Sequence, residues 1–164
     1  MKRILVINGS ASEHSSNGLL IEQLISLGSS FFEFEKFESL KSLPHFDPKP
    51  VEIPDAVVLF WKKVEEADKV LFCTPEYIFS IPSGLKNALE WSVSTTIFSG
   101  KSIGIITASA SGVLGHEELQ RIMKTLGAHF SPENTLLISG IKGKAGVDPE
   151  LDEKLSLFLS SWEN

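Results

Sequence analysis

Short, continuous runs of apolar residues set the strongest limit on how this chain can fold. Four such runs recur, at residues 4–7, 70–72, 103–106 and 136–138, and most of their side chains are isoleucine, leucine or valine. Runs of this kind are typical of parallel strands that are buried on both faces. A fifth strand is expected at 31–37, where phenylalanines alternate with charged residues as in an edge strand exposed on one side.

Segments with helical spacing lie between these runs. In each segment apolar residues stand three and four positions apart, which places them on one face of a helix. Pro54 and Pro82 suit the first turn of a helix, and Gly28 and Gly127 supply stop signals. The expected helices span residues 17–27, 54–67, 82–91, 116–126 and 148–162.

Strands and helices therefore alternate along the whole chain. This alternation predicts an α/β fold, a doubly wound three-layer sandwich around a five-stranded parallel sheet. We expect the strand order 2-1-3-4-5, with a ligand crevice at the carboxyl ends of strands 1 and 3. With 164 residues, 42% of them hydrophobic, the chain is expected to form one domain over residues 1–164. Functional residues should then lie in the loops after Asn8, Thr74 and Ala108.

Net charge, hydropathy and cysteine content limit the binding partners and the cellular compartment that can be expected. The net charge is −6, and the densest cationic spots, 62–63 and 142–144, are too short to follow a phosphate backbone, so we expect no nucleic-acid partner. The apolar run at 4–7 is too short for a signal peptide and no stretch reaches the ~20 residues of a membrane span, so we expect a cytoplasmic protein without a membrane partner. The single cysteine, Cys73, is expected to be a small buried hydrophobe.

The loop after the first strand is rich in small polar residues. It contains Gly9, Ser10, Ser12, Ser15, Ser16 and Asn17 and leads directly into the first helix. Free N–H groups at a helix N-terminus, surrounded by hydroxyls, form an anion site that needs no lysine. The loop lacks Gly-x-Gly-x-x-Gly and Gly-Lys-Ser/Thr, so a monophosphate fits better than a dinucleotide or a triphosphate. The same residues could instead serve only as a helix cap.

The loop after the third strand carries a more specific motif. Residues 75–77 read Pro-Glu-Tyr, 80–82 read Ser-Ile-Pro and 85–88 read Leu-Lys-Asn-Ala, with Trp91 closing the segment. This string resembles the signature of the NADPH-dependent FMN reductase family, which includes flavin, quinone, azo-dye and chromate reductases. The first loop is similar to the same family's Gly-Ser-x-Arg-x-x-Ser-x-Asn motif, and together the two motifs extend the resemblance over nearly the whole chain.

The resemblance implies a flavodoxin-like fold with bound FMN. The flavin phosphate would lie in the loop 10–17, the isoalloxazine against 75–80, and the pyrimidine end of the ring near 109–112. The cofactor-binding residues implied are Gly9, Ser10, Ser12, Ser15, Ser16, Asn17, Pro75, Glu76, Tyr77, Ile78, Phe79, Ser80, Ser109, Ala110, Ser111 and Gly112. Without the resemblance, 109–112 reads simply as a flexible turn.

Three positions depart from the family pattern. Ser12 stands where the family has arginine, so the phosphate loses its usual cationic partner. Ile78 and Phe79 stand where the family commonly has Asn-Gly, which bears on the choice of acceptor. Gly115 is followed by His116 instead of a second glycine. We expect these changes to affect the substrate more than the binding of flavin.

The resemblance also implies a reaction. An NADPH- or NADH-dependent FMN reductase or quinone reductase would pass electrons through the flavin to a small acceptor, such as a quinone, a flavin, an azo compound or a metal oxyanion. Because the flavin carries the chemistry, we expect no catalytic side chain, and the scattered histidines predict no metal site. A homodimer or homotetramer is implied, and Phe79 and Phe98 are candidates for its interface, although either could be core.

Side chains of the second loop and its helix have two possible roles. Glu76 and Tyr77 are expected to serve the flavin site mainly through backbone and packing. Lys86 could pair with Glu90 at i,i+4 or could meet a ligand.

Two other functions remain open from the sequence. A flavodoxin-type electron carrier would bind FMN but no nicotinamide nucleotide, and the net acidity suits such a protein. A non-catalytic binding protein that has lost the flavin would account for Ser12 and for the Ile78-Phe79 pair. Rapid NAD(P)H oxidation would exclude the carrier, and FMN binding would exclude the protein without flavin.

Overall fold

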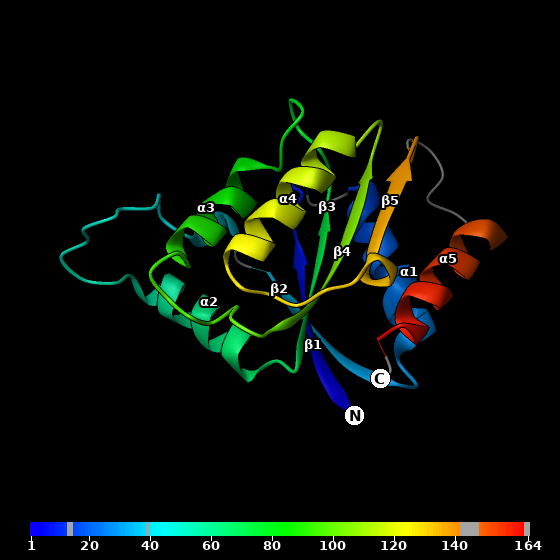
Figure 1. The fold of residues 1–164 in the computed structure, drawn as a ribbon, viewed down its shortest axis with the longest axis horizontal. Helices are drawn as coiled ribbons and strands as arrows, with labels where there is room; N and C mark the ends of the chain where they lie inside the picture. Colours follow the sequence, from blue (N-terminus) through cyan, green and yellow to red (C-terminus); the bar gives the residue numbers. More distant parts are fainter. Residues whose placement is uncertain (13–14, 39, 142–147, 163–164) are drawn as a thin grey trace.

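Five parallel strands form the centre of the molecule (Figure 1). The computed structural model describes residues 1–12, 15–38, 40–141 and 148–162. The strands are β1 (Lys2–Asn8), β2 (Phe32–Phe37), β3 (Lys69–Thr74), β4 (Ser102–Ser109) and β5 (Thr135–Ser139). They pair in the order β2-β1-β3-β4-β5, which confirms the predicted order. Because all strands are parallel, the loops after β1, β3 and β4 leave the same edge of the sheet.

Helices cover both faces of the sheet, as predicted (Figure 1). One face carries α1 (Ser16–Gly28) and α5 (Pro149–Ser160). The other carries α2 (Asp55–Glu66), α3 (Ser83–Trp91) and α4 (Val113–Thr125). Two short 3-10 turns, η1 (Leu40–Ser42) and η2 (Pro132–Asn134), lie in the connections. No helix within the described ranges combines the length and the hydropathy needed to cross a lipid bilayer.

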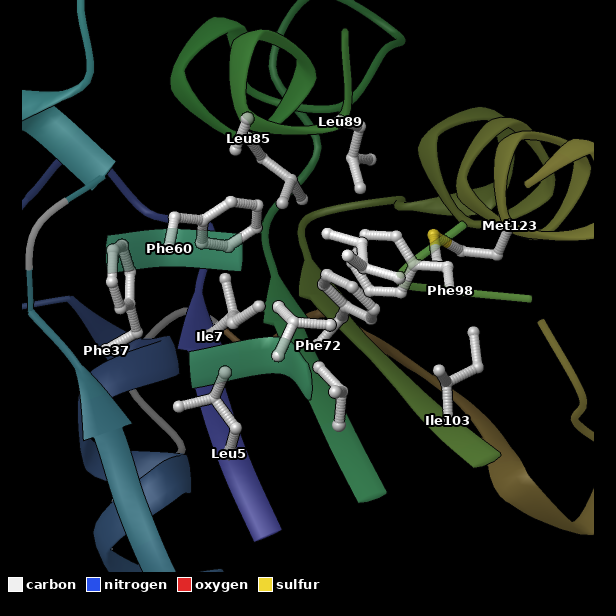
Figure 2. Close-up of a cluster of buried hydrophobic side chains, with 14 of the residues drawn as sticks. Leu5, Ile7, Phe37, Phe60, Phe72, Leu85, Leu89, Phe98, Ile103 and Met123 are labelled. Atoms are coloured by element: carbon white, nitrogen blue, oxygen red, sulfur yellow. The ribbon is translucent and has the colours of Figure 1, made fainter. Parts of the chain in front are cut away.

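Alternate strand residues fill the layer beneath α2, α3 and α4 (Figure 2). Ile7 of β1 and Phe72 of β3 meet Phe60 of α2 and Leu85 of α3, and each of these side chains is at most 1% exposed. Burying one side chain of this size contributes about 1.5–3 kcal/mol. Phe98 belongs to the same cluster and is 1% exposed, so of the two roles left open for it, interface and core, the structure supports the core.

The opposite layer is closed by aromatic residues at the end of the chain. A Cβ added at Gly104 of β4 would lie 2.5 Å from the Trp162 ring and 2.6 Å from the Phe158 ring, so only glycine lets these rings pack on the strand. Cys73 is 1% exposed in this layer, which confirms the prediction of a buried small side chain. Burial raises the pKa of its thiol to about 12, so the thiol stays protonated at neutral pH.

Two predicted features differ in the structure. The run 136–138 is only half-buried because β5 forms an edge of the sheet, so the prediction of a strand buried on both faces is wrong there. α4 begins at Val113, ahead of the predicted start at His116, because a side chain from another loop caps its first turn. The predicted edge strand β2 does alternate at its start, with Phe32 buried and Glu33 exposed. The basic spot at 142–144 lies outside the described residues.

Candidate active site

The first loop leaves β1 in close contact with the end of β3. The Gly9 amide donates a hydrogen bond to the Cys73 carbonyl at 2.8 Å. A Cβ at Gly9 would lie 2.3 Å from the Thr74 hydroxyl oxygen, so a larger residue would push the two loops apart. Glycine at this position therefore fixes the distance between the first two loops of the site.

Serine hydroxyls line the first turn of α1. Ser15 is the N-cap, and its hydroxyl accepts a hydrogen bond from the Gly18 amide at 3.0 Å. The Ser10 hydroxyl accepts from the Ser12 amide at 3.2 Å, and Ser16 opens the helix half-buried. The first turn of α1 contains no acidic residue. Apart from the Gly18 amide, which the Ser15 hydroxyl binds, the first amides of α1 and the helix dipole therefore remain available to an external anion.

Asn17 faces inward. The residue is 3% exposed, and its side-chain amide donates to the Ala108 carbonyl at 3.0 Å. Its carbonyl oxygen accepts a weak bond from the Cys73 thiol at 3.4 Å. Asn17 thus ties the start of α1 to the ends of β3 and β4, and its side chain is used for positioning.

A cavity of about 320 Å³ lies beside the serine loop, between the ends of β1 and β2. Ser10 and Ser12 line it from one side, and Glu38 and Lys41 line it from the other. Lys41, in η1, brings a cation to the loop from which the family's arginine is missing. The sequence contained no motif that marked this lysine, because only the parallel pairing of β1 and β2 brings the ends of those strands together.

The second loop contains a tight hairpin turn. Tyr77 and Ser80 exchange both backbone hydrogen bonds, at 2.8 and 3.1 Å. Ile78 and Phe79 between them have positive φ angles of 51° and 58°, which is the geometry of a type I′ turn. Their side chains are 95% and 71% exposed. The Tyr77 hydroxyl lies 3.3 Å from the Ser10 hydroxyl and so joins this turn to the first loop.

Glu76 caps α4 from outside that helix. One carboxylate oxygen accepts from the Gly112 amide at 3.1 Å and the other from the Gly115 amide at 2.8 Å. A Cβ at Gly115 would lie 3.3 Å from Glu76 and from the Ser80 carbonyl, so glycine allows this close approach. The sequence predicted a role for Glu76 through backbone and packing, whereas the structure gives its carboxylate a role of its own.

Glu118 of α4 supports the other end of the hairpin. It accepts from the Ser80 hydroxyl at 2.6 Å and from the Ile81 amide at 2.9 Å, and it pairs with Lys86 at 3.5 Å. Burial alone would raise the pKa of Glu118, but these hydrogen bonds and the Lys86 charge outweigh it and lower that pKa. Lys86 therefore pairs across to α4 and not with Glu90, which was one of the two partners left open for it; the other, a ligand, stays a prediction.

The third loop is held at both ends. The Ser109 hydroxyl donates to the Glu76 carbonyl at 3.4 Å, and the Ser111 carbonyl accepts from the Ser139 hydroxyl at 2.7 Å. Gly112 adopts a left-handed φ of 89°, in which a side chain would be strained. Ala110 and Ser111 are exposed at the carboxyl end of the sheet. The three loops thus form one hydrogen-bonded unit, and they bring the predicted site residues to one edge.

Residues 2–143 match the sequence profile of the family described as NADPH-dependent FMN reductase. The chain belongs to this family. It is 28% identical to a quinone reductase from Escherichia coli K12 over 160 residues, which cover 92% of this chain and 84% of the relative. It is 33% identical to a 2-hydroxy-1,4-benzoquinone reductase from a Burkholderia species over 132 residues, or 78% of this chain and 71% of the relative.

Solved structures show the same fold. FerB, an NAD(P)H:acceptor oxidoreductase from Paracoccus denitrificans, superposes with a TM-score of 0.81 at 24% identity, covering 99% of this chain and 96% of its own. An FMN-dependent NADH-azoreductase from Bacillus anthracis, solved with FMN, gives a TM-score of 0.69 at 15% identity, covering 99% of this chain and 100% of its own. As a member of the family, this FMN reductase is an oxidoreductase with FMN as cofactor and NAD(P)H as co-substrate.

Proposed function

We propose that this FMN reductase holds its flavin in the three-loop site and passes electrons from NAD(P)H to a quinone. The observation that carries the proposal is the first turn of α1, which has serine hydroxyls and no acidic residue. The α4 N-terminus, by contrast, already holds the Glu76 carboxylate. Of these two helix ends, α1 is the one that suits a phosphate. The relatives named for quinones support the choice of acceptor.

Each loop has a distinct part in this proposal. Ser10, Ser12, Ser15 and Ser16 would bind the phosphate together with the α1 amides, and Lys41 would supply the cation from across the cavity. The backbone of Pro75–Ser80 would support the isoalloxazine, and that of Ser109–Gly112 would border its pyrimidine end. Gly9 and Asn17 would fix the loops from behind. The outward exposure of Ile78 and Phe79 leaves their side chains free for another role.

A bound FMN would supply the redox chemistry that links oxidation of the nicotinamide to reduction of the quinone. The overall reaction, NAD(P)H + H⁺ + quinone → NAD(P)⁺ + hydroquinone, takes one proton from solvent. The contribution of this chain is to orient the ring within loops that are tied together through Glu76, Glu118 and Tyr77. No side-chain base is required for such a transfer.

We also propose that the protein is a homodimer or homotetramer in the cytoplasm. An apolar cavity of about 260 Å³ opens between α3 and α4, lined by Leu89, Val93, Ile122 and Leu126 among others. Val93 is 66% exposed there and would be covered by a second copy. The single cysteine, which is buried and not part of a disulfide, suits a reducing compartment such as the cytoplasm.

Size-exclusion chromatography with light scattering tests the proposed dimer or tetramer, and a monomer at micromolar concentration would contradict it.

A charge placed at the α1 N-terminus tests the proposed site. In Ser16→Glu the new carboxylate suits the helix dipole, so the fold should be retained, but it would repel the flavin phosphate. We expect the Kd for FMN to rise about tenfold or more, while the Kd for riboflavin, which lacks the phosphate, changes little. Flavin fluorescence quenching measures both constants. Ser156→Glu adds the same charge at an exposed residue of α5 and is the matched control.

Turnover completes the test. The wild-type protein loaded with FMN should oxidise NADPH or NADH rapidly when a quinone is present. Binding of FMN without nucleotide oxidation would instead identify an electron carrier, and failure to bind FMN would identify a protein that has lost the flavin. If Ser16→Glu weakened the binding of FMN and of riboflavin equally, the flavin phosphate would not lie at the α1 N-terminus.

A further inference from the structure

The turn at Ile78 and Phe79 is built from residues that oppose its geometry. Type I′ turns need positive φ at both central positions and favour Asn-Gly, the pair common in this family. Here the two φ angles are 51° and 58°, and the residues are a β-branched isoleucine and a phenylalanine. Positive φ is unfavourable for bulky side chains and most of all for β-branched ones. The sequence at the tip therefore works against the local fold.

Packing within the chain does not offset this strain. The Ile78 and Phe79 side chains are 95% and 71% exposed, so they bury little apolar surface in the described structure. A strained conformation persists only where its surroundings fix it, and such sites are often functional. The exposed pair is therefore a candidate for a role outside the fold.

The surroundings do fix the turn. Tyr77 and Ser80 close it with two backbone hydrogen bonds, and Glu118 binds both the Ser80 hydroxyl and the Ile81 amide. Glu76, immediately before the turn, is anchored to Gly112 and Gly115 of the α4 N-terminus. The two side chains are therefore presented on a rigid support.

Other exposed apolar residues lie next to the turn. Val113 and Leu114, 44% and 48% exposed, lie between the two glycines that bind Glu76. Tyr77 is 40% exposed at the base of the turn. We call Tyr77, Ile78, Phe79, Val113 and Leu114 the apolar rim. None of these five side chains carries a charge, and they border the loop proposed to support the flavin ring.

We propose that the apolar rim binds the electron acceptor and selects hydrophobic aromatic quinones over charged ones. The inference rests on the proposed function, because the rim borders the isoalloxazine only if FMN lies on the Pro75–Ser80 backbone. A nicotinamide nucleotide carries phosphates and ribose hydroxyls, and the rim offers them no cation and only one hydroxyl. A flat apolar ring instead gains contact with Ile78 and Phe79 and removes their surface from water.

Restoring the pair that the turn prefers tests the proposal. The double variant Ile78→Asn with Phe79→Gly relieves the strain and removes both apolar side chains, so its Tm should rise. The two probes are 1,4-naphthoquinone and its 2-sulfonate, which have the same ring and differ by one negative charge that the apolar side chains would deprive of water. The ratio of kcat/KM for the apolar over the charged quinone should fall about tenfold, mainly through KM. The single variant Phe79→Gly should give an intermediate ratio.

The control and the contrary outcomes are distinct. Leu157→Ser removes an exposed apolar side chain from α5 and should leave the ratio unchanged. An unchanged ratio in the double variant, with FMN bound and the sulfonate reduced, would overturn this inference alone. A more than tenfold loss of FMN affinity in that variant would also overturn it, because the pair would then act on the flavin. A wild-type protein that binds no FMN would overturn the proposed function and this inference with it.

Discussion

At the scale of single residues, Glu76 links two loops that lie far apart in the chain. Its carboxylate accepts hydrogen bonds from two amides at the α4 N-terminus, where the helix dipole favours a negative charge. Glu76→Gln keeps one acceptor oxygen but removes the charge. We expect the free energy of unfolding to fall by about 1–3 kcal/mol and FMN affinity to weaken, because the second and third loops separate. Urea denaturation and flavin titration measure the two effects.

Glu117→Gln is the matched control for Glu76. It removes an exposed carboxylate from the same helix and should change neither quantity by more than about 0.5 kcal/mol. If Glu76→Gln is as mild as this control, the carboxylate does not hold the loops together.

Lys41 is the residue that the sequence could not reveal. It lines the cavity beside Ser10 and Ser12, where the family's arginine is absent. Lys41→Met should raise the Kd for FMN about three- to tenfold and leave riboflavin binding unchanged, since only the phosphate meets the cation. Added salt should weaken FMN binding less in this variant than in the wild type. Lys49→Met, an exposed lysine of the same connection, should behave as wild type; if it matches Lys41→Met, the effect is one of net charge.

At the scale of elements, α3 holds the long connection that follows η1. Asn87 accepts a hydrogen bond from the Phe46 amide at 2.8 Å and donates to the Pro44 carbonyl at 2.9 Å. The Trp91 indole donates to the same carbonyl at 2.8 Å, and its ring packs edge-on against Phe46. The Asn and the closing Trp of the family-like motif therefore serve here to fasten a segment of chain.

Asn87→Ala should release this segment. The Phe46 amide and the Pro44 carbonyl lose a partner, so we expect the free energy of unfolding to fall by about 1–3 kcal/mol. Chymotrypsin should also cut more quickly at Phe46 under native conditions, because the local opening becomes easier. Glu90→Ala, on the same helix, is the control. An unchanged cleavage rate in Asn87→Ala would show that Trp91 alone holds the connection.

The elements were more predictable from the sequence than the contacts between them. Periodicity and turn residues were enough for every strand, and the alternation of five strands with helices was enough for the strand order, because right-handed crossovers leave few arrangements of such a sheet. The start of α4 was missed because its cap, Glu76, lies far away in the chain. The I′ turn was missed because Ile78 and Phe79 are residues that this turn normally excludes. Tertiary contacts determine both the start of α4 and the I′ turn, and such contacts cannot be predicted from local sequence patterns.

At the scale of the whole molecule, two groups of α4 link stability to pH in different ranges. Glu118 has a lowered pKa, so its stabilising effect is present above its ordinary value and is lost as the pH falls through the lowered one. His116 is buried beside Thr107, with its ring nitrogen 2.8 Å from the hydroxyl oxygen. Burial lowers the pKa of His116 below 6.5, although the nearby Glu117 opposes this. His116 therefore changes the free energy of unfolding near neutral pH, and Glu118 changes it at acidic pH.

The sign for His116 follows from proton uptake. As the pH falls from about 7.5, the unfolded chain protonates this histidine before the folded chain does, so the free energy of unfolding decreases with falling pH until the lowered pKa is passed. His116→Asn should flatten this slope, whatever its effect on absolute stability, and urea midpoints from pH 5 to 8 measure it. Thr107→Val keeps the burial that causes the shift and should keep the slope. If His116→Asn and wild type lose stability in parallel over this range, another group must account for the pH dependence.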